Sequence, residues 1–171
     1  MSLSRRSRLF SFVLAACAFA SWVGPAGADG DGWRGEDRPA QESVDEGGGP
    51  TRAERAAKMA VQAVGLPYRW GGESPTTGFD CSGLVRWAYG SVGIDLPHSS
   101  YSLYDMGRSV PGPRLAPGDL LFFEGLGHVG LYVGRGRMVH APQTGRNVEI
   151  VRLASAGYGG RLLGARRIAV G

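Results

Sequence analysis

The sequence predicts an α+β domain in which N-terminal helices pack on a C-terminal antiparallel β-sheet. Two observations lead to this class. Apolar residues recur at helical spacing between residues 51 and 100, and short strand-like runs separated by turn residues fill the chain after residue 117. No helical pattern lies between those runs, so neighbouring strands are expected to pair antiparallel.

Two longer helices are expected in the first half. Thr51 and Glu54 fit a capping box, in which each side chain accepts a hydrogen bond from the other residue's backbone. The helix that follows is expected to end at Gly65 and to bury Ala53, Ala56, Ala57, Ala60, Val61 and Val64. A second helix is expected to begin at Asp80 and stop at Gly93. Its expected buried residues are Leu84, Val85, Ala88 and Val92.

A short third helix is expected near Ser99 or Ser100. The expected strands cover residues 120–123, 129–133, 138–141, 148–151 and 162–170. Because these strands follow one another with short connections, they are expected to form an antiparallel meander.

Composition divides the chain into three segments. Residues 1–28 combine arginines, an apolar run and a small-residue cleavage site, which is the layout of a secretory signal peptide. The run is too short to favour a membrane span. Residues 29–50 are acidic and glycine-rich and are expected to form a flexible linker before the folded domain at 51–171. We therefore expect an exported protein, either secreted, periplasmic or associated with the cell wall, with a lipid anchor at Cys17 as the alternative.

The folded region is basic. Residues 52–171 hold 14 Arg or Lys and 8 Asp or Glu, a formal charge of +6. This charge suits a polyanionic surface such as bacterial cell wall, although ordinary solvated arginines account for it as well. No basic helix or alternation of aromatic and basic residues favours nucleic acid. A monomer is expected.

Cys81 is the one cysteine that remains after removal of residues 1–28, which excludes a disulfide framework. With Asp80 as N-cap, Cys81 lies in the first helical turn, where free N–H groups and the helix dipole favour negative charge. Reactive cysteines in such positions have pKa values of roughly 3.5–7.5, so a stabilised thiolate is expected. The charge of Asp80 opposes it slightly, so a cationic partner is expected to contribute as well. Gly83 indicates a close approach to this turn, by substrate or by the sheet.

A reactive thiol needs a base that titrates near neutral pH, and the candidates are His98, His128 and His140. The last two flank a turn at residues 134–136. A three-residue loop pairs residue 130 with His140 and directs both rings to one face as diagonal neighbours, whereas a four-residue loop separates them. Spacing alone leaves open which histidine is the base.

Five segments resemble, in content and order, the NlpC family of papain-like cell-wall cysteine endopeptidases. They are Tyr68-Arg69-Trp70-Gly71-Gly72, Gly78-Phe79-Asp80-Cys81-Ser82-Gly83-Leu84-Val85, Pro117-Gly118-Asp119-Leu120-Leu121-Phe122-Phe123, His128-Val129-Gly130-Leu131-Tyr132 and Met138-Val139-His140-Ala141-Pro142. The likeness extends over roughly residues 53–168. It implies a papain-like fold with Cys81 as nucleophile, His128 as base and His140 as the polar third member.

The resemblance also implies roles for neighbouring residues. Tyr68 would help to stabilise the oxyanion, and Asp80 and Ser82 would shape the site and bind the free amine of the substrate. The hydroxyls of Ser99 and Ser100 would lie on the substrate side. The implied reaction is hydrolysis of the bond between D-glutamate and a diamino acid in peptidoglycan stem peptides, without a metal or other cofactor.

Two residues depart from the family pattern: His98 stands where arginine is more usual, and Leu103 where glutamine is. Both affect the expected choice of stem peptide. A zinc site made of Cys81, His128 and His140 lacks short ligand spacing. A cell-wall amidase, an acyltransferase or a non-catalytic wall-binding module remain alternatives on the same fold.

Overall fold

The computed structural model describes residues 48–155 and 157–169. The expected signal peptide, Cys17 and nearly all of the expected linker lie outside this part, so they stay predictions. Within the described residues, no helix is both long and apolar enough to span a bilayer.

Capping residues set the starts of the three α-helices found in residues 48–155 and 157–169. The helices are α1 (Arg52–Gln62), α2 (Cys81–Gly90) and α3 (Ser100–Tyr104). The expected capping box is confirmed: the Thr51 hydroxyl accepts a 3.1 Å hydrogen bond from the Glu54 amide, and the Glu54 carboxylate accepts a 2.8 Å bond from the Thr51 amide. Asp80 caps α2 and Ser99 caps α3. Each cap satisfies a backbone donor that the first helical turn leaves free.

The main sheet has six antiparallel strands. Their spatial order is β3 (Arg108–Ser109), β8 (Leu162–Arg167), β4 (Leu120–Phe123), β5 (Val129–Gly134), β6 (Arg137–His140) and β7 (Glu149–Arg152). The expected meander holds from β4 to β7 and is wrong for the last strand. β8 pairs with β4, with Leu121 opposite Ala165, rather than with β7. Since every residue of β4 is buried, both of its edges need a backbone partner, and β8 supplies the second one.

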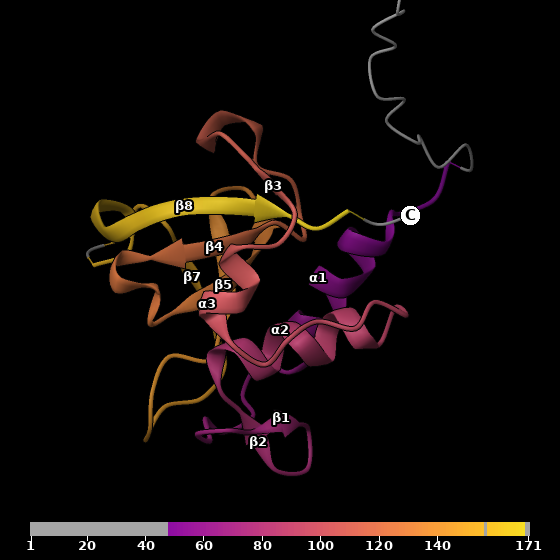
Figure 1. Cartoon of the computed structure of the whole chain (residues 1–171). Helices are drawn as coiled ribbons and strands as arrows, with labels where there is room; N and C mark the ends of the chain where they lie inside the picture. Colours follow the sequence, from indigo (N-terminus) through magenta and orange to yellow (C-terminus); the bar gives the residue numbers. More distant parts are fainter. Residues whose placement is uncertain (1–47, 156, 170–171) are drawn as a thin grey trace, which may run out of the picture. The chain divides into compact units, whose positions relative to one another are not determined.

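A second, two-stranded sheet is formed by β1 (Glu73–Ser74) and β2 (Gly78–Phe79), and lies below α2 in the view of Figure 1. The sequence analysis does not predict these strands or β3, because two residues are too few to show a period. Short 3₁₀ segments precede two strands of the main sheet: η2 (Glu124–Leu126) before β5 and η3 (Gly159–Arg161) before β8.

The core has two layers separated by β4. Leu120 and Phe122 pack in the larger cluster, which includes the buried faces of α1 and α2. Leu121 and Phe123 pack in a smaller cluster with Met138, on the other side of the strand. The helices therefore cover one face of the sheet, as expected for an α+β domain.

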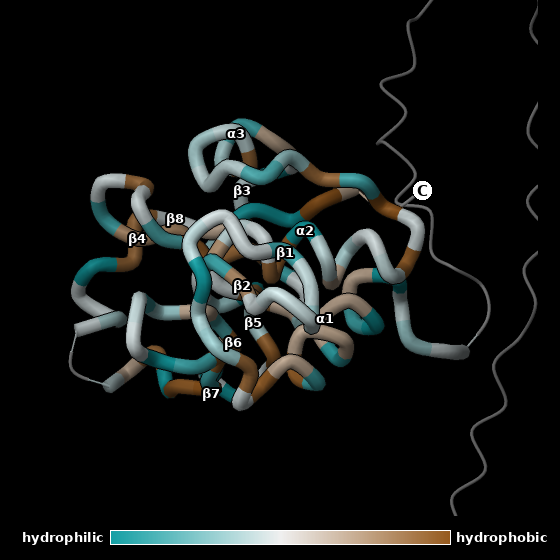
Figure 2. Tube along the Cα trace, turned by 90° about the horizontal axis from the view of Figure 1, so that it is seen from below, coloured by the Kyte–Doolittle hydropathy of each residue, from teal (hydrophilic) through white to brown (hydrophobic). Residues whose placement is uncertain are grey.

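The buried face of α1 is narrower than expected. Ala56, Ala57 and Ala60 are buried, whereas Val61 and Val64 are 38% and 44% exposed. Figure 2 shows α1 alternating between tan and teal, and the buried residues of this helix are all alanines. The short alanine side chains let the backbone of α1 come close to its neighbours, and the valines beside the stripe face outward. Likewise α2 ends at Gly90 rather than at Gly93, and leaves Val92 only partly buried.

The β5–β6 hairpin determines which face the histidines use. Leu131 lies opposite Val139 and Tyr132 opposite Met138, which is the expected register. The expected three-residue loop is wrong: Gly134 pairs with Arg137, leaving a two-residue turn, and a bulge follows Tyr132. The turn residues both have positive φ, as a type I′ hairpin requires. The bulge absorbs one residue, so the register beyond it is the same as in the expected hairpin.

Gly83 allows the β1–β2 sheet to approach α2. A Cβ built on Gly83 would overlap the carbonyl oxygen of Gly72 and lie 3.0 Å from Nε2 of His98. The close approach expected at this glycine is therefore made by the backbone just before β1. The amide of Asp80 donates a 2.9 Å hydrogen bond to that same carbonyl, which fixes the loop on the start of the helix.

We predict that Gly83→Ala destabilises the domain by about 1–3 kcal/mol, because the new methyl meets backbone that cannot move aside. Gly90→Ala in the same helix is the matched control, since nothing lies within 4 Å of its Cβ position. That change is expected to be neutral or stabilising by up to about 1 kcal/mol. Chemical denaturation of both variants measures the difference, and equal stabilities would contradict the contact.

Candidate active site

Cys81 is the first residue of α2 and is partly buried against the core. The backbone amides of Ser82 and Val129 are placed to donate hydrogen bonds to its sulfur. Because Val129 directly follows His128 in the chain, the sulfur faces the start of β5. Cys81 is the free cysteine of the described part of the chain.

The pKa of the Cys81 thiol is higher than the sequence analysis predicts. Burial raises the pKa of Cys81, and the charge of Asp80 raises it further. The two neighbouring amides act in the opposite direction, and burial outweighs them. The expected stabilised thiolate is therefore wrong for the free protein: Cys81 rests as a neutral thiol and has to lose its proton during a reaction.

His128 and His140 meet on one face of the sheet, as the hairpin register predicts. Nε2 of His128 lies 2.8 Å from Nδ1 of His140, and the two rings are edge to face at 78°. His140 is fully buried. Burial lowers the pKa of both rings from 6.5 to about 4, with a further contribution from His140 and Arg161 at His128, and from Arg146 at His140. Both imidazoles are therefore neutral at pH 7.

Asp80 joins the start of α2 to the surrounding loops. Its Oδ1 accepts hydrogen bonds from the Gly83 amide at 2.7 Å, the Ser82 hydroxyl at 3.2 Å and Nε2 of His98 at 2.9 Å. Its Oδ2 accepts a 2.9 Å bond from the Gly71 amide. Four donors thus hold one carboxylate next to Cys81.

His98 contacts two acidic side chains. Its Nδ1 lies 3.3 Å from Glu73 of β1, while its Nε2 lies on Asp80. Arg86 of α2 forms a 2.7 Å ion pair with the same Glu73. His98, one of the two residues that depart from the family pattern, is thus a link between β1, the loop before α3 and the capped end of α2. The other, Leu103, is fully buried in the core.

Tyr68 lies near Cys81 and Asp80, and burial and the charges of these two groups raise its pKa. Its phenol is therefore neutral and keeps its proton for donation. Ser99 uses its hydroxyl to cap α3, and the Ser100 hydroxyl donates a 2.6 Å bond to the carbonyl of Leu126. These bonds are structural, so a substrate-binding role for the two serines stays a prediction.

Four residues close to the histidines were missed by the sequence analysis. Glu149 stands opposite His140 across β6 and β7, with Oε1 3.7 Å from His140 Nε2. Arg146 holds Glu149 with two hydrogen bonds of 2.9 and 2.8 Å. Tyr158 stacks edge to face on His140, and Arg161 lies beside His128. The strand register could have found Glu149, but the other three lie in irregular segments without a sequence period.

The described residues contain no group of three or more His, Cys, Asp or Glu side chains placed to hold a metal ion. The carboxylate network of Asp80 directly precedes Cys81, and the imidazole pair lies at the start of β5, where the Val129 amide is placed to donate to the sulfur. A thiol and a hydrogen-bonded pair of neutral imidazoles are the side chains that thiol-based acyl transfer uses.

Two relatives found by sequence comparison are named as endopeptidases. Murein DD-endopeptidase MepH of Escherichia coli is 41% identical over 129 residues, which cover 68% of this chain and 48% of that protein. A probable endopeptidase of Mycobacterium tuberculosis is 48% identical over 101 residues, covering 58% of this chain and 26% of that protein. The chain thus spans about half or less of the length of these curated relatives.

Two solved structures also superpose on this chain. An NlpC/P60 family protein from Bacillus cereus superposes with a TM-score of 0.64 at 39% identity, covering 67% of this chain and 39% of that chain. The peptidoglycan hydrolase RipB of Mycobacterium tuberculosis superposes with a TM-score of 0.61 at 34% identity, covering 70% and 66%. The model of the NlpC/P60 family matches residues 65–167, from just after α1 to the last residue of β8, and by this match the chain belongs to the NlpC/P60 family.

Proposed function

We propose that the protein is a cysteine peptidase that hydrolyses an amide bond in the stem peptides of peptidoglycan, between D-glutamate and a diamino acid. One observation carries the proposal. The thiol of Cys81, at the capped start of α2, faces the start of β5, where His128 forms a 2.8 Å hydrogen bond with the buried His140. Cys81 is the nucleophile in this proposal, His128 is the base and His140 orients the base.

The surroundings of His140 indicate which nitrogen carries each proton. Nε2 of His140 is buried without a hydrogen-bond partner, and its nearest charged neighbour is the carboxylate of Glu149 at 3.7 Å. A proton on this nitrogen faces the carboxylate favourably, whereas a lone pair would be repelled. Nδ1 of His140 is then the acceptor, and Nε2–H of His128 is the donor. Nδ1 of His128 keeps a free lone pair and is the atom that takes the thiol proton.

The reaction then follows from these positions. As sulfur attacks the scissile carbonyl carbon, its proton passes to Nδ1 of His128, and the C–N bond breaks when the imidazolium returns that proton to the leaving amine. Water hydrolyses the thioester in a second step, again giving its proton to His128 and releasing the thiol of Cys81. The neutral phenol of Tyr68 donates to the developing oxyanion.

Asp80 and Ser82 give the site its preference for a substrate amine. An ammonium group on the acyl side of the scissile bond would find a fixed carboxylate at Asp80 and a hydroxyl at Ser82, held together by a 3.2 Å hydrogen bond. Such an amine is present where the stem peptide has been freed from its glycan strand. The site therefore favours cutting within stems rather than release of whole stems, which is the amidase reaction.

A second candidate bond is the peptide crosslink between two stems. The relative that is 41% identical is named a murein DD-endopeptidase, whereas another, 41% identical over 98 residues, is named a bifunctional muramidase and DL-endopeptidase. Both activities use the same acyl transfer, so the catalytic residues are those given above in either case. The two bonds differ in the chemistry next to the scissile carbonyl, and product masses distinguish them.

The proposed substrate lies outside the cytoplasmic membrane. An exported protein fits this location, with residues 1–28 as signal peptide and 29–50 as a linker to the peptidase domain at 51–171. The formal charge of +6 on residues 52–171 suits a polyanionic cell wall. A lipid anchor at Cys17 would hold the same domain at the membrane surface. The monomeric state and the lack of a cofactor also belong to the proposal.

We predict that Cys81→Ala lowers turnover of defined muropeptides by at least about 10³-fold, because the nucleophile is lost. The fold should persist, with a melting temperature within about 4 °C of wild type, since a partly buried thiol contributes little packing. Mass spectrometry of the products identifies the bond that the wild type cuts. Alkylation of the wild type should abolish activity and a chelator should not. Equal turnover by the variant would rule out the proposal, and loss of activity with chelator alone would favour a metal enzyme.

We also predict an unusually acidic lower limit of activity. The base works when unprotonated, and its pKa is lowered to about 4, so kcat/KM should fall to half its maximum between about pH 4 and 5 rather than near 6.5. The stability of the fold also decreases as the pH falls. The unfolded chain binds more protons between pH 6.5 and 4, so stability is complete above pH 6.5 and decreases below it. Circular dichroism at each pH separates unfolding from titration, and a half-point at 6.5 or above in folded protein would contradict the neutral base.

A further inference from the structure

The carboxylate of Glu149 lies at the buried end of the imidazole pair. Strands β6 and β7 place Glu149 directly opposite His140, and its Oε1 is 3.7 Å from Nε2 of that ring. His140 is fully buried, and within the described residues this Nε2 has no hydrogen-bond partner. Buried polar atoms without a partner are rare, and Glu149 is the charged group that this one faces.

Arg146 holds this carboxylate in place. Its Nη2 donates hydrogen bonds of 2.9 and 2.8 Å to the two oxygens of Glu149. The backbone of Arg146 is fixed as well, because its carbonyl accepts a 2.9 Å hydrogen bond from the Tyr68 amide. Burial lowers the pKa of His140, and the positive charge of Arg146 lowers it further. Arg146 therefore offsets the negative charge of Glu149 beside the imidazole pair.

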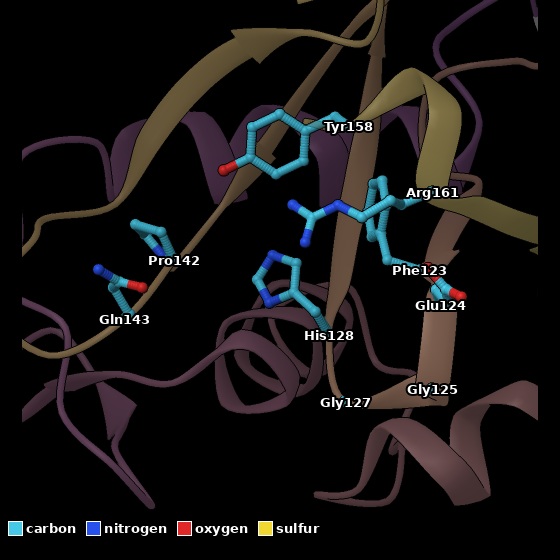
Figure 3. Close-up of a pocket in the computed structure, with 9 residues that line it drawn as sticks. All are labelled: Phe123, Glu124, Gly125, Gly127, His128, Pro142, Gln143, Tyr158 and Arg161. Carbon is cyan, nitrogen blue, oxygen red and sulfur yellow. The ribbon is translucent and has the colours of Figure 1, made fainter. Parts of the chain in front are cut away.

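On the side of the neighbouring pocket, a positive and a neutral group face the pair. Figure 3 shows the guanidinium of Arg161 beside the imidazole of His128, with the ring of Tyr158 nearby. Burial and the charge of Glu149 raise the pKa of the Tyr158 phenol, which is therefore neutral. Glu124 lines the same pocket, but within residues 48–155 and 157–169 it forms no ion pair with either ring. Glu149 is thus the carboxylate that acts on the pair.

Two neutral proton arrangements are open to the imidazole pair, and only one of them supports catalysis. In the first, Nε2 of each ring carries the proton, so Nδ1 of His128 has a free lone pair. In the second, Nδ1 of each ring carries the proton, and His128 has no lone pair for the thiol proton of Cys81. The carboxylate of Glu149 favours the first arrangement, because it attracts an N–H at Nε2 of His140 and repels a lone pair there.

We propose that Glu149 is a positioning residue that selects the competent arrangement, and that Arg146 keeps the charge of Glu149 from protonating the pair. The inference rests on the proposed function and adds two residues that act through His140 rather than on the substrate. Without Arg146, the full negative charge of Glu149 would favour a resting imidazolium, which cannot accept a thiol proton. Glu149 thus sets the position of the proton, and Arg146 sets the charge of the base.

Nitrogen-15 NMR of His140 tests the selection independently of turnover. In wild type at pH 7 the proton is expected on Nε2. Glu149→Gln should move it to Nδ1, because Arg146 retains the amide oxygen and the amide NH₂ then faces Nε2. Turnover of defined muropeptides should fall about 10–100-fold, less than the roughly 10⁴-fold loss when a carboxylate bonded directly to a catalytic base is replaced. A proton that stays on Nε2 in the variant overturns the inference, since any loss of activity would then be structural.

Arg146→Gln tests the charge of the base. Removing the positive charge should raise the pKa of both rings, so the acidic half-point of kcat/KM should move up by about one pH unit. Arg152→Gln, an exposed arginine of β7 opposite Arg137, is the matched control and should leave the half-point unchanged. Equal half-points in the two variants overturn the role of Arg146, because a purely structural ion pair would not move them. If no muropeptide is cleaved, NMR titration of the two rings makes the same comparison, so the positioning roles stand or fall separately from the peptidase.

Discussion

The backbone register of β5 and β6 is the constraint on which the candidate site depends. Leu131 opposite Val139 directs His128 and His140 to the same face, where their rings share a 2.8 Å hydrogen bond. A slip by one residue would turn one ring to the opposite face. The bulge after Tyr132 maintains this register despite a two-residue turn. The backbone geometry next to the turn therefore determines which face of the sheet the two histidines occupy at the open end of the hairpin.

The second requirement is the fixed start of α2. Asp80 caps the helix and accepts hydrogen bonds from its first turn, from His98 and from Gly71, so one carboxylate fixes the start of α2 to the neighbouring loops. Burial keeps the thiol protonated and the imidazoles neutral. The candidate site thus holds an uncharged thiol and two uncharged imidazoles at pH 7.

Much of this arrangement could be predicted from the sequence, because it depends on local rules. The cap at Asp80, the capping box at Thr51 and the strand at 120–123 each follow from residue type and spacing, and the structure confirms them. The pairing of β8 with β4 and the contact of Gly83 with Gly72 depend on distant segments and have no local period. The raised pKa of Cys81 has the same origin, since the degree of burial is a tertiary property that outweighs the helix end.

Nitrogen-15 NMR of the histidine rings at pH 7 tests the central claim, that Nδ1 of His128 is a neutral acceptor facing Cys81. The account predicts an uncharged His128 ring with its proton on Nε2, and a shift of the Nδ1 resonance when Cys81 is replaced by alanine. A charged ring, a proton on Nδ1, or a resonance that does not respond to loss of the thiol would contradict it.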